Sequence, residues 1–257
     1  MRILGLAWIL AAAVLSQGLA PVQDERALPE PEPFYEAVRQ NIARAQREQN
    51  RYAYKERRTD IHTNPFGRIG TGGTRVIDVV PAPDGLTAIR RLIERDSVPV
   101  PDPPPERINL PQRRNTNGSR NVDDITQTLK FTIAKREIVG GHSSIVVLFE
   151  PRPNAKPTTR QGRLARAFKG TMWVNEAALE VERLEATAIQ DMSIGLGFVA
   201  RVRKGATVSA ERKPVDGGMW MPTSLRFNGE GRAMLFRKLD VDYAMDWFDY
   251  RLVAAAR

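Results

Sequence analysis

The sequence contains no cysteine, and its only histidines are His62 and His142. The absence of thiols excludes disulfide bonds, a cysteine nucleophile, iron–sulfur clusters and cysteine-bound zinc. Two histidines are too few for a catalytic zinc site with three histidine ligands. We therefore expect neither a metal centre nor a cofactor in this protein.

Residue patterns typical of an enzyme active site are also missing. Asp240 and Asp242 share one face of an expected strand, but that face is solvated, whereas a general acid needs an apolar pocket that raises its pKa. Ser143 follows His142 at an expected hairpin turn and not at a strand-to-helix elbow. The glycines of 70–73 precede no Lys-Ser/Thr pair, so they indicate a turn and not a phosphate-binding loop. We predict no catalytic residue and no enzymatic activity.

The first twenty residues have the features of a secretory signal peptide. Arg2 precedes the unbroken apolar run Ile3–Leu15, and Gly18 and Ala20 provide the small residues of a cleavage site. This run has 13 residues, whereas a membrane-spanning helix needs about 20. We predict that residues 1–20 are removed after Ala20 and that the mature protein is periplasmic.

Arginine carries most of the positive charge. The chain has 31 arginines and 8 lysines against 30 acidic residues, a formal net charge of +9. An exported protein rarely meets nucleic acid, so we expect no nucleic-acid binding. The arginines indicate either a solvated surface or attraction to an anionic membrane surface or an acidic protein partner.

The predicted mature chain starts with a proline-rich leader, residues 21–33, which we expect to be extended and mobile. Apolar residues at spacings of four, four and three then predict a helix over 34–50. The segment 99–121 contains six prolines, which fix φ and remove amide donors, so we expect an irregular excursion there. Residues 34–257 are predicted to form one domain that includes this excursion.

From residue 51 onward the period becomes that of β-strands. The clearest hairpin joins Lys130–Val139 to Ser143–Phe149 through a Gly-Gly turn, and its second strand has no polar face, so we expect that strand to be buried on both sides. Leu86–Val98 fits both a helix and a strand, and we favour a strand because a turn precedes it and a proline follows. Further pairs are predicted at 168–175 with 182–189, 198–204 with 207–215, and 220–228 with 234–245, the last around a turn at 229–231.

These elements predict a mainly β (α+β) fold, an antiparallel meander that forms an unclosed β-barrel with the N-terminal helix packed against one face. Aromatic and apolar residues on its strands make either a filled core or an open cavity that binds acyl chains. The residues that would line such a cavity are Phe131, Trp173, Phe198, Trp220, Phe227, Leu235 and Tyr243.

Three short motifs resemble the bacterial LolA/LolB-like superfamily of lipoprotein-sorting carriers. Phe168–Asn175 (FKGTMWVN) and Val181–Glu185 (VERLE) are similar to its central hairpin, and Val215–Pro222 (VDGGMWMP) to a later turn. The resemblance covers about Phe34–Val253 and implies an open β-barrel over helices, with an apolar cavity for lipid acyl chains and no cofactor. The long excursion at 99–121 departs from the compact carriers.

The leading hypothesis is a non-enzymatic periplasmic protein that binds or carries an acylated ligand, either a lipid or a lipoprotein. The alternative is an envelope protein-interaction or stress-sensing module on the same fold, which binds an acidic partner through its arginines. A hydrolase of envelope polymers is a third hypothesis. The oligomeric state does not follow from the sequence.

Overall fold

A computed structural model describes residues 26–60, 73–110, 116–194, 200–233 and 237–253. The helices are α1 (Pro31–Glu48), α2 (Thr116–Thr128) and α3 (Arg160–Ala165), and the 3₁₀ turn η1 (Gln49–Arg51) follows α1. The strands are β1 (Tyr52–Asp60), β2 (Gly73–Pro81), β3 (Thr87–Arg95), β4 (Val98–Pro99), β5 (Glu106–Asn109), β6 (Leu129–Val139), β7 (His142–Pro151), β8 (Phe168–Asn175), β9 (Glu180–Ala188), β10 (Met192–Ile194), β11 (Ala200–Val202), β12 (Thr207–Pro214), β13 (Trp220–Ala233) and β14 (Arg237–Leu252).

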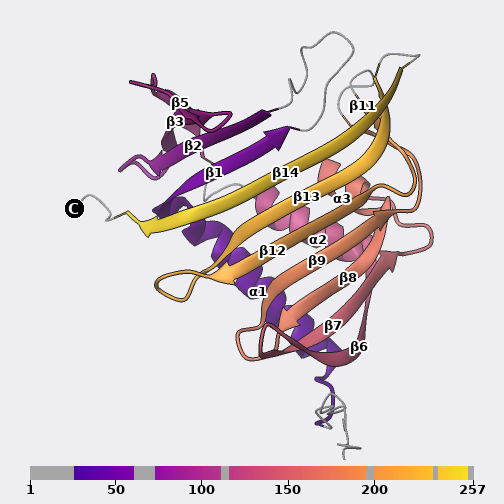
Figure 1. The fold of residues 1–257 in the computed structure, drawn as a ribbon. Helices are drawn as coiled ribbons and strands as arrows, with labels where there is room; N and C mark the ends of the chain where they lie inside the picture. Colours follow the sequence, from indigo (N-terminus) through magenta and orange to yellow (C-terminus); the bar gives the residue numbers. More distant parts are fainter. Residues whose placement is uncertain (1–25, 61–72, 111–115, 195–199, 234–236, 254–257) are drawn as a thin grey trace, which may run out of the picture.

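All the described strands belong to one 14-stranded antiparallel sheet. The main order is β4-β3-β2-β1-β14-β13-β12-β9-β8-β7-β6, while β5 pairs with β3, and β11 pairs with β10 and β13. The sheet curls over α1, α2 and α3, which lie on one of its faces (Figure 1). Among the described strands none joins β6 to the opposite edge, so the barrel is open. The predicted fold class is thereby confirmed.

Helix α1 packs on the sheet through the apolar face that its spacing predicts. Phe34 and Val38 are 5% exposed and pack against the inward side chains of β7 and β8, including Ile145, Val147 and Val174. The helix begins at Pro31, three residues earlier than predicted, because proline fits the first helical turn, where its missing N–H is not needed. We call the sheet face that contacts α1 the inner face.

The predicted leader is in contact with the domain over its described residues. The guanidinium group of Arg136 is 5% exposed and donates to the carbonyl oxygens of Arg26 and Ala27 at 2.6 and 3.0 Å. The same group forms an ion pair with Glu176 at 2.6 Å. The N-terminal residues 1–25, including the predicted signal peptide, lie outside the described residues.

The sequence pattern located most strands correctly and was wrong at several other points. The hairpin of β6 and β7 and the strand β3 are confirmed. β11 pairs with β10 and β13, so the predicted pairing of 198–204 with 207–215 was wrong. The segment 99–121 is less irregular than expected, because β5 pairs with β3 and α2 begins at Thr116. Leu148 on β7 is 45% exposed, so that strand is not fully buried on its outer side.

The glycine that the sequence suggested as a turn residue lies inside a strand. Gly229 pairs with Val241, and β13 continues to Ala233. A Cβ atom on Gly229 would lie 2.6 Å from the Cβ of Ala206. Glycine is therefore required here for close packing and not for reversal of the chain.

Gly170 on β8 is a second glycine in close contact, and its replacement should destabilise the sheet. A Cβ atom on Gly170 would lie 2.0 Å from the carbonyl oxygen of Glu185 and 2.8 Å from Cζ of Phe149. Gly170→Ala is expected to lower the free energy of unfolding by about 2–3 kcal/mol, because neither neighbour can move without disturbing the pairing of β8 with its neighbours. Chemical denaturation measures this loss. The control Thr171→Ala, on the outer face, should change the free energy of unfolding by about 0.5 kcal/mol at most. If the two variants had the same free energy of unfolding, the close contact at Gly170 would be contradicted.

Candidate functional site

A cavity of about 490 Å³ lies between α1, α2 and the inner face of the sheet. We call it the helix-covered cavity. Its walls are mainly apolar, and charged side chains line only part of it. Wall residues come from both helices and from the strands β6–β9, and they include Phe34, Tyr35, Ile125, Phe131, Met172 and Leu184.

Strand alternation explains why the cavity floor is apolar. Successive side chains point to opposite faces of a sheet, so Met172 and Leu184, which are paired in register on β8 and β9, lie on the same face. Both pack against the buried cluster of Leu129, Phe149 and Ala186. The ring of Tyr35 on α1 lies 5.9 Å from that of Phe131, which extends this apolar surface from the helix to β6.

Helices α1 and α2 are linked beside the cavity by a surface ion pair. Nη1 of Arg39 lies 2.9 Å from Oδ1 of Asp123, and Nη2 of Arg39 lies 2.7 Å from Oε2 of Glu36. Hydrogen bonds from Gln40 and Arg39 lower the pKa of Glu36. These groups are exposed, so the link between the helices is weak and can break easily.

A buried carboxylate holds α2 against the loop that leads into α3. Asp124 accepts hydrogen bonds from the backbone N–H and the hydroxyl of both Thr158 and Thr159, at 2.7–3.2 Å. These bonds lower the pKa of Asp124 to about 2. Thr159 in turn caps α3 by accepting from the N–H of Gly162 at 3.0 Å. One carboxylate therefore sets where α2 lies over the cavity.

The depressed pKa of Asp124 makes a prediction about acid stability. The unfolded group titrates near 3.9, so the stabilisation is fully present above that pH and is lost as the pH falls toward 2. The wild type is expected to lose thermal stability across this window, and Asp124→Ala should lose much less between the same two pH values. Melting temperatures at pH 5 and pH 2.5 test this, with Asp123→Asn as the neighbouring surface control. Parallel pH profiles for wild type and Asp124→Ala would contradict it.

The carboxyl-terminal half of α1 is anchored by a second buried carboxylate. Glu180 is 1% exposed, and its Oε2 lies 2.9 Å from Nη1 of Arg212, while its Oε1 lies 3.5 Å from Nη2 of Arg44 on α1. Asn41, also on α1, donates to the carbonyl oxygens of Ala178 and Leu179 at 3.0 Å. These contacts attach α1 to the turn between β8 and β9.

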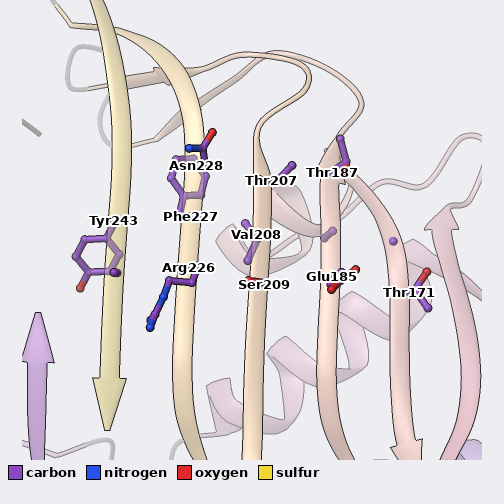
Figure 2. Close-up of a pocket in the computed structure, with 13 residues that line it drawn as sticks. Thr171, Glu185, Thr187, Thr207, Val208, Ser209, Arg226, Phe227, Asn228 and Tyr243 are labelled. Atoms are coloured by element: carbon purple, nitrogen blue, oxygen red, sulfur yellow. The ribbon is translucent and has the colours of Figure 1, made fainter. Parts of the chain in front are cut away.

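A second cavity, of about 600 Å³, is lined by β8, β9, β12, β13 and β14. Figure 2 shows its lining residues on these strands, with helices behind the sheet. Thr171, Glu185, Ser209 and Arg226 are paired in register across the strands, and alternation places them opposite the inner face. This row gives the second cavity hydroxyl and charged groups, and Ala186, Val208 and Phe227 also line it. We call it the outer groove.

The sequence-predicted cavity residues are divided between the two cavities. Phe131 lines the helix-covered cavity. Phe227 and Tyr243 are paired in register, and Phe227 pairs with Val208, which packs on the inner face. Alternation therefore places both side chains on the inner face, although both residues also border the outer groove. Phe198 and Leu235 lie outside the described residues.

The two predicted tryptophans line neither cavity. Trp173 follows Met172 on β8 and therefore has its side chain on the outer face. There its Nε1 donates to Glu137 at 2.7 Å, and the guanidinium of Arg183 lies 4.9 Å from the ring centroid. Trp220 begins β13, away from both sets of lining residues.

Sequence reasoning missed the contribution of α2 to the site. Val122 and Ile125 on α2 both line the helix-covered cavity, and their spacing of three matches one helical face. The same reasoning named aromatic residues and passed over Met172 and Leu184, although Leu184 lies between the polar residues Arg183 and Glu185, a pattern that indicates a buried face.

Several of the arginines that suggested an acidic partner have intramolecular partners. Arg57 stacks on Phe248 at 5.2 Å from the ring centroid, and Arg58 and Arg90 both form ion pairs with buried Glu56. Within the described ranges there is no group of three or more His, Asp or Glu that could hold a metal ion. None of the described helices is long and apolar enough to cross a membrane.

Comparison with known proteins gives matches only among solved structures. No family model matches the sequence, and no curated protein matches it significantly. A LolA superfamily protein from Nitrosomonas europaea is 14% identical, with 85% of this chain and 93% of that chain covered and a TM-score of 0.34. A putative outer membrane lipoprotein-sorting protein domain from Vibrio parahaemolyticus is 10% identical, with 87% and 95% covered and a TM-score of 0.38.

A further match is the MucA/MucB complex of Pseudomonas aeruginosa. The sequence identity to this structure is 9%, and the TM-score is 0.26. The match covers 85% of this chain and 99% of that chain. Identities and TM-scores this low do not transfer a function, a ligand or a partner. The chain is similar over most of its length to LolA superfamily and lipoprotein-sorting proteins, and what it binds has to be inferred from its own cavities.

Proposed function

We propose that this protein is a non-enzymatic periplasmic binding or carrier protein that holds an acyl chain in the helix-covered cavity. The observation that supports the proposal is an apolar cavity of about 490 Å³ between two helices and the open face of the sheet. Small-molecule sites have volumes of roughly 300–1,000 Å³ and mostly apolar walls with a few polar groups that set orientation. The helix-covered cavity has these properties.

Burial of methylenes alone provides useful affinity in such a cavity. Each buried methylene contributes about 0.8 kcal/mol, so about ten of them contribute roughly 8 kcal/mol before the entropy lost on association is subtracted. The floor formed by Phe131, Met172 and Leu184 contributes dispersion contacts without requiring any hydrogen bond from the chain. No reacting group is needed for this function.

Two measurements on the full chain test the proposal. Mass spectrometry of protein purified from its native envelope should find an acylated molecule bound at close to one per chain. The delipidated protein should then bind a fluorescent fatty acid with micromolar affinity, and unlabelled fatty acid should displace it. A protein that copurifies with no acylated molecule and binds no fatty acid would not be an acyl carrier.

The second candidate function is an envelope protein-interaction or stress-sensing module that binds an acidic partner. The outer groove supports it, because Arg226 lies there among hydroxyl-bearing side chains. Its guanidinium group forms an ion pair with Asp246 at 2.5 Å, so a partner would have to compete with that carboxylate. Recovery of a partner in a pull-down that collapses as salt is raised would favour this function over the first.

A further inference from the structure

Arg152 lies beside the helix-covered cavity and is held in place by backbone contacts. It directly follows β7 and is one of the residues that line the cavity. Its backbone N–H donates to the carbonyl oxygen of Thr128 at 2.8 Å, and its Nε donates to that of Leu129 at 3.0 Å. Both acceptors lie at the junction of α2 and β6, so the arginine is tied to two walls of the cavity.

The charge of Arg152 is not compensated in the way that the other charges at the cavity are. Glu36 and Arg39, which also line it, form an ion pair with each other at 2.7 Å. Glu32 lies in the first turn of α1, where the helix dipole stabilises a carboxylate. No carboxylate of a described residue forms an ion pair with Arg152, whose side chain is exposed. Arg152 therefore places at the edge of an apolar cavity a cation that has no carboxylate partner among the described residues.

We propose that the ligand of the helix-covered cavity carries an anionic head group, a carboxylate or a phosphate, which is bound by Arg152. This inference rests on the proposed function and specifies the class of acyl ligand. The guanidinium group presents N–H donors in a planar fork that matches two oxygens of a carboxylate or phosphate. With Nε already bonded to Leu129, the terminal NH₂ groups remain for the ligand. The acyl chain then lies along Phe131 and Met172, and the head group stays at the solvent edge.

The inference is tested with three probes that share one acyl chain length and differ in the head group. They are dodecanoate, dodecyl phosphate and 1-dodecanol, each measured against the delipidated full chain below its aggregation concentration. Arg152→Gln should weaken one or both anionic probes about tenfold and leave 1-dodecanol unchanged. The anion that is weakened identifies the head group, since a free fatty acid presents a carboxylate and a phospholipid a phosphate. Arg152→Lys should give an intermediate loss, and Lys156→Gln, in the exposed loop nearby, should give none.

The outcomes separate this inference from the proposed function. If every probe binds Arg152→Gln as tightly as the wild type, the protein binds acyl chains but Arg152 does not select an anionic head. Equal weakening of all three probes, 1-dodecanol included, would also overturn the inference, because the loss would then come from the cavity itself. If no probe binds the wild type, the proposed function fails first. Melting temperatures confirm that each variant is folded before its affinity is compared.

Discussion

Replacing Leu184 by tryptophan is expected to lower the affinity for a fatty acid at least about tenfold. Leu184 lies on the floor of the helix-covered cavity and pairs with the small residue Ala210 on β12, so a larger ring can extend into the cavity without meeting a large side chain there. An indole ring in the space that the acyl chain would occupy prevents the burial of several methylenes, each of which contributes about 0.8 kcal/mol. The loss of two such contributions exceeds the 1.4 kcal/mol that corresponds to a tenfold change in affinity. Displacement of a fluorescent fatty acid measures the change.

The matched control is Leu148→Trp on β7. Leu148 is 45% exposed on the outer face, so this variant adds the same ring outside the cavity and should leave fatty acid affinity unchanged. Overpacking at Leu184 can lower the free energy of unfolding by about 1–3 kcal/mol, which chemical denaturation detects separately from binding. If folded Leu184→Trp binds the fatty acid as tightly as Leu148→Trp does, the acyl chain does not lie on this floor.

Glu180→Ala is expected to produce the largest loss of stability, about 3 kcal/mol in the free energy of unfolding. Glu180 is 1% exposed and pairs with Arg212, whose side chain is only 20% exposed. Removing one member of a buried ion pair leaves the other charge without a partner, which costs about 3–5 kcal/mol when both are fully buried. The partial exposure of Arg212 places the expected value at the lower end. Urea or guanidinium denaturation measures it.

Two control variants separate the buried pair from the surface contact. Glu180→Gln keeps the shape and an oxygen acceptor for Arg212, so its loss should be smaller than that of Glu180→Ala. Arg44→Ala removes a partner whose side chain is 56% exposed, and should cost about 1 kcal/mol or less. If Arg44→Ala were as damaging as Glu180→Ala, the anchor of α1 would depend on the surface contact and not on the Glu180–Arg212 pair.

The two halves of α1 are held by different polar contacts. Glu180 and Asn41 fasten the carboxyl-terminal half to the β8–β9 turn, whereas Arg39 meets Asp123 only through an exposed ion pair. The amino-terminal half covers the cavity, and apolar packing of Phe34 and Val38 against β7 and β8 also holds it there.

Period-two alternation and turn residues predicted the sheet well where both were present. The β6–β7 hairpin has alternating or buried strands on either side of a Gly-Gly turn, so its position followed from local pattern alone. Gly229 misled the same reasoning, because a glycine that permits close packing and a glycine that permits a turn look alike in a sequence. The pairing of β11 with β13 could not be predicted, since it depends on contacts between distant strands.

The cavity was predicted in kind but only partly in composition. Of the candidates named from the sequence, Phe131 lines the helix-covered cavity, while Trp173 lies on the outer face because Met172, beside it, takes the inward position. Which of two adjacent apolar residues points inward depends on the register of the strand, and both Met172 and Trp173 are apolar. The roles of Asp124 and Glu180 as anchors could not be predicted from the sequence, because each carboxylate binds residues that lie far away along the chain.

The most direct test of acyl binding in the helix-covered cavity is paramagnetic NMR with a nitroxide-labelled stearate. An acyl chain that occupies this cavity should broaden the methyl signals of Ile125, Met172 and Leu184, which line it, more strongly than those of Thr207 and Ala244 in the outer groove. Unlabelled stearate should restore the broadened signals. Selective broadening of Thr207 and Ala244 with sharp Met172 and Leu184 signals would place the acyl chain in the outer groove and contradict the account.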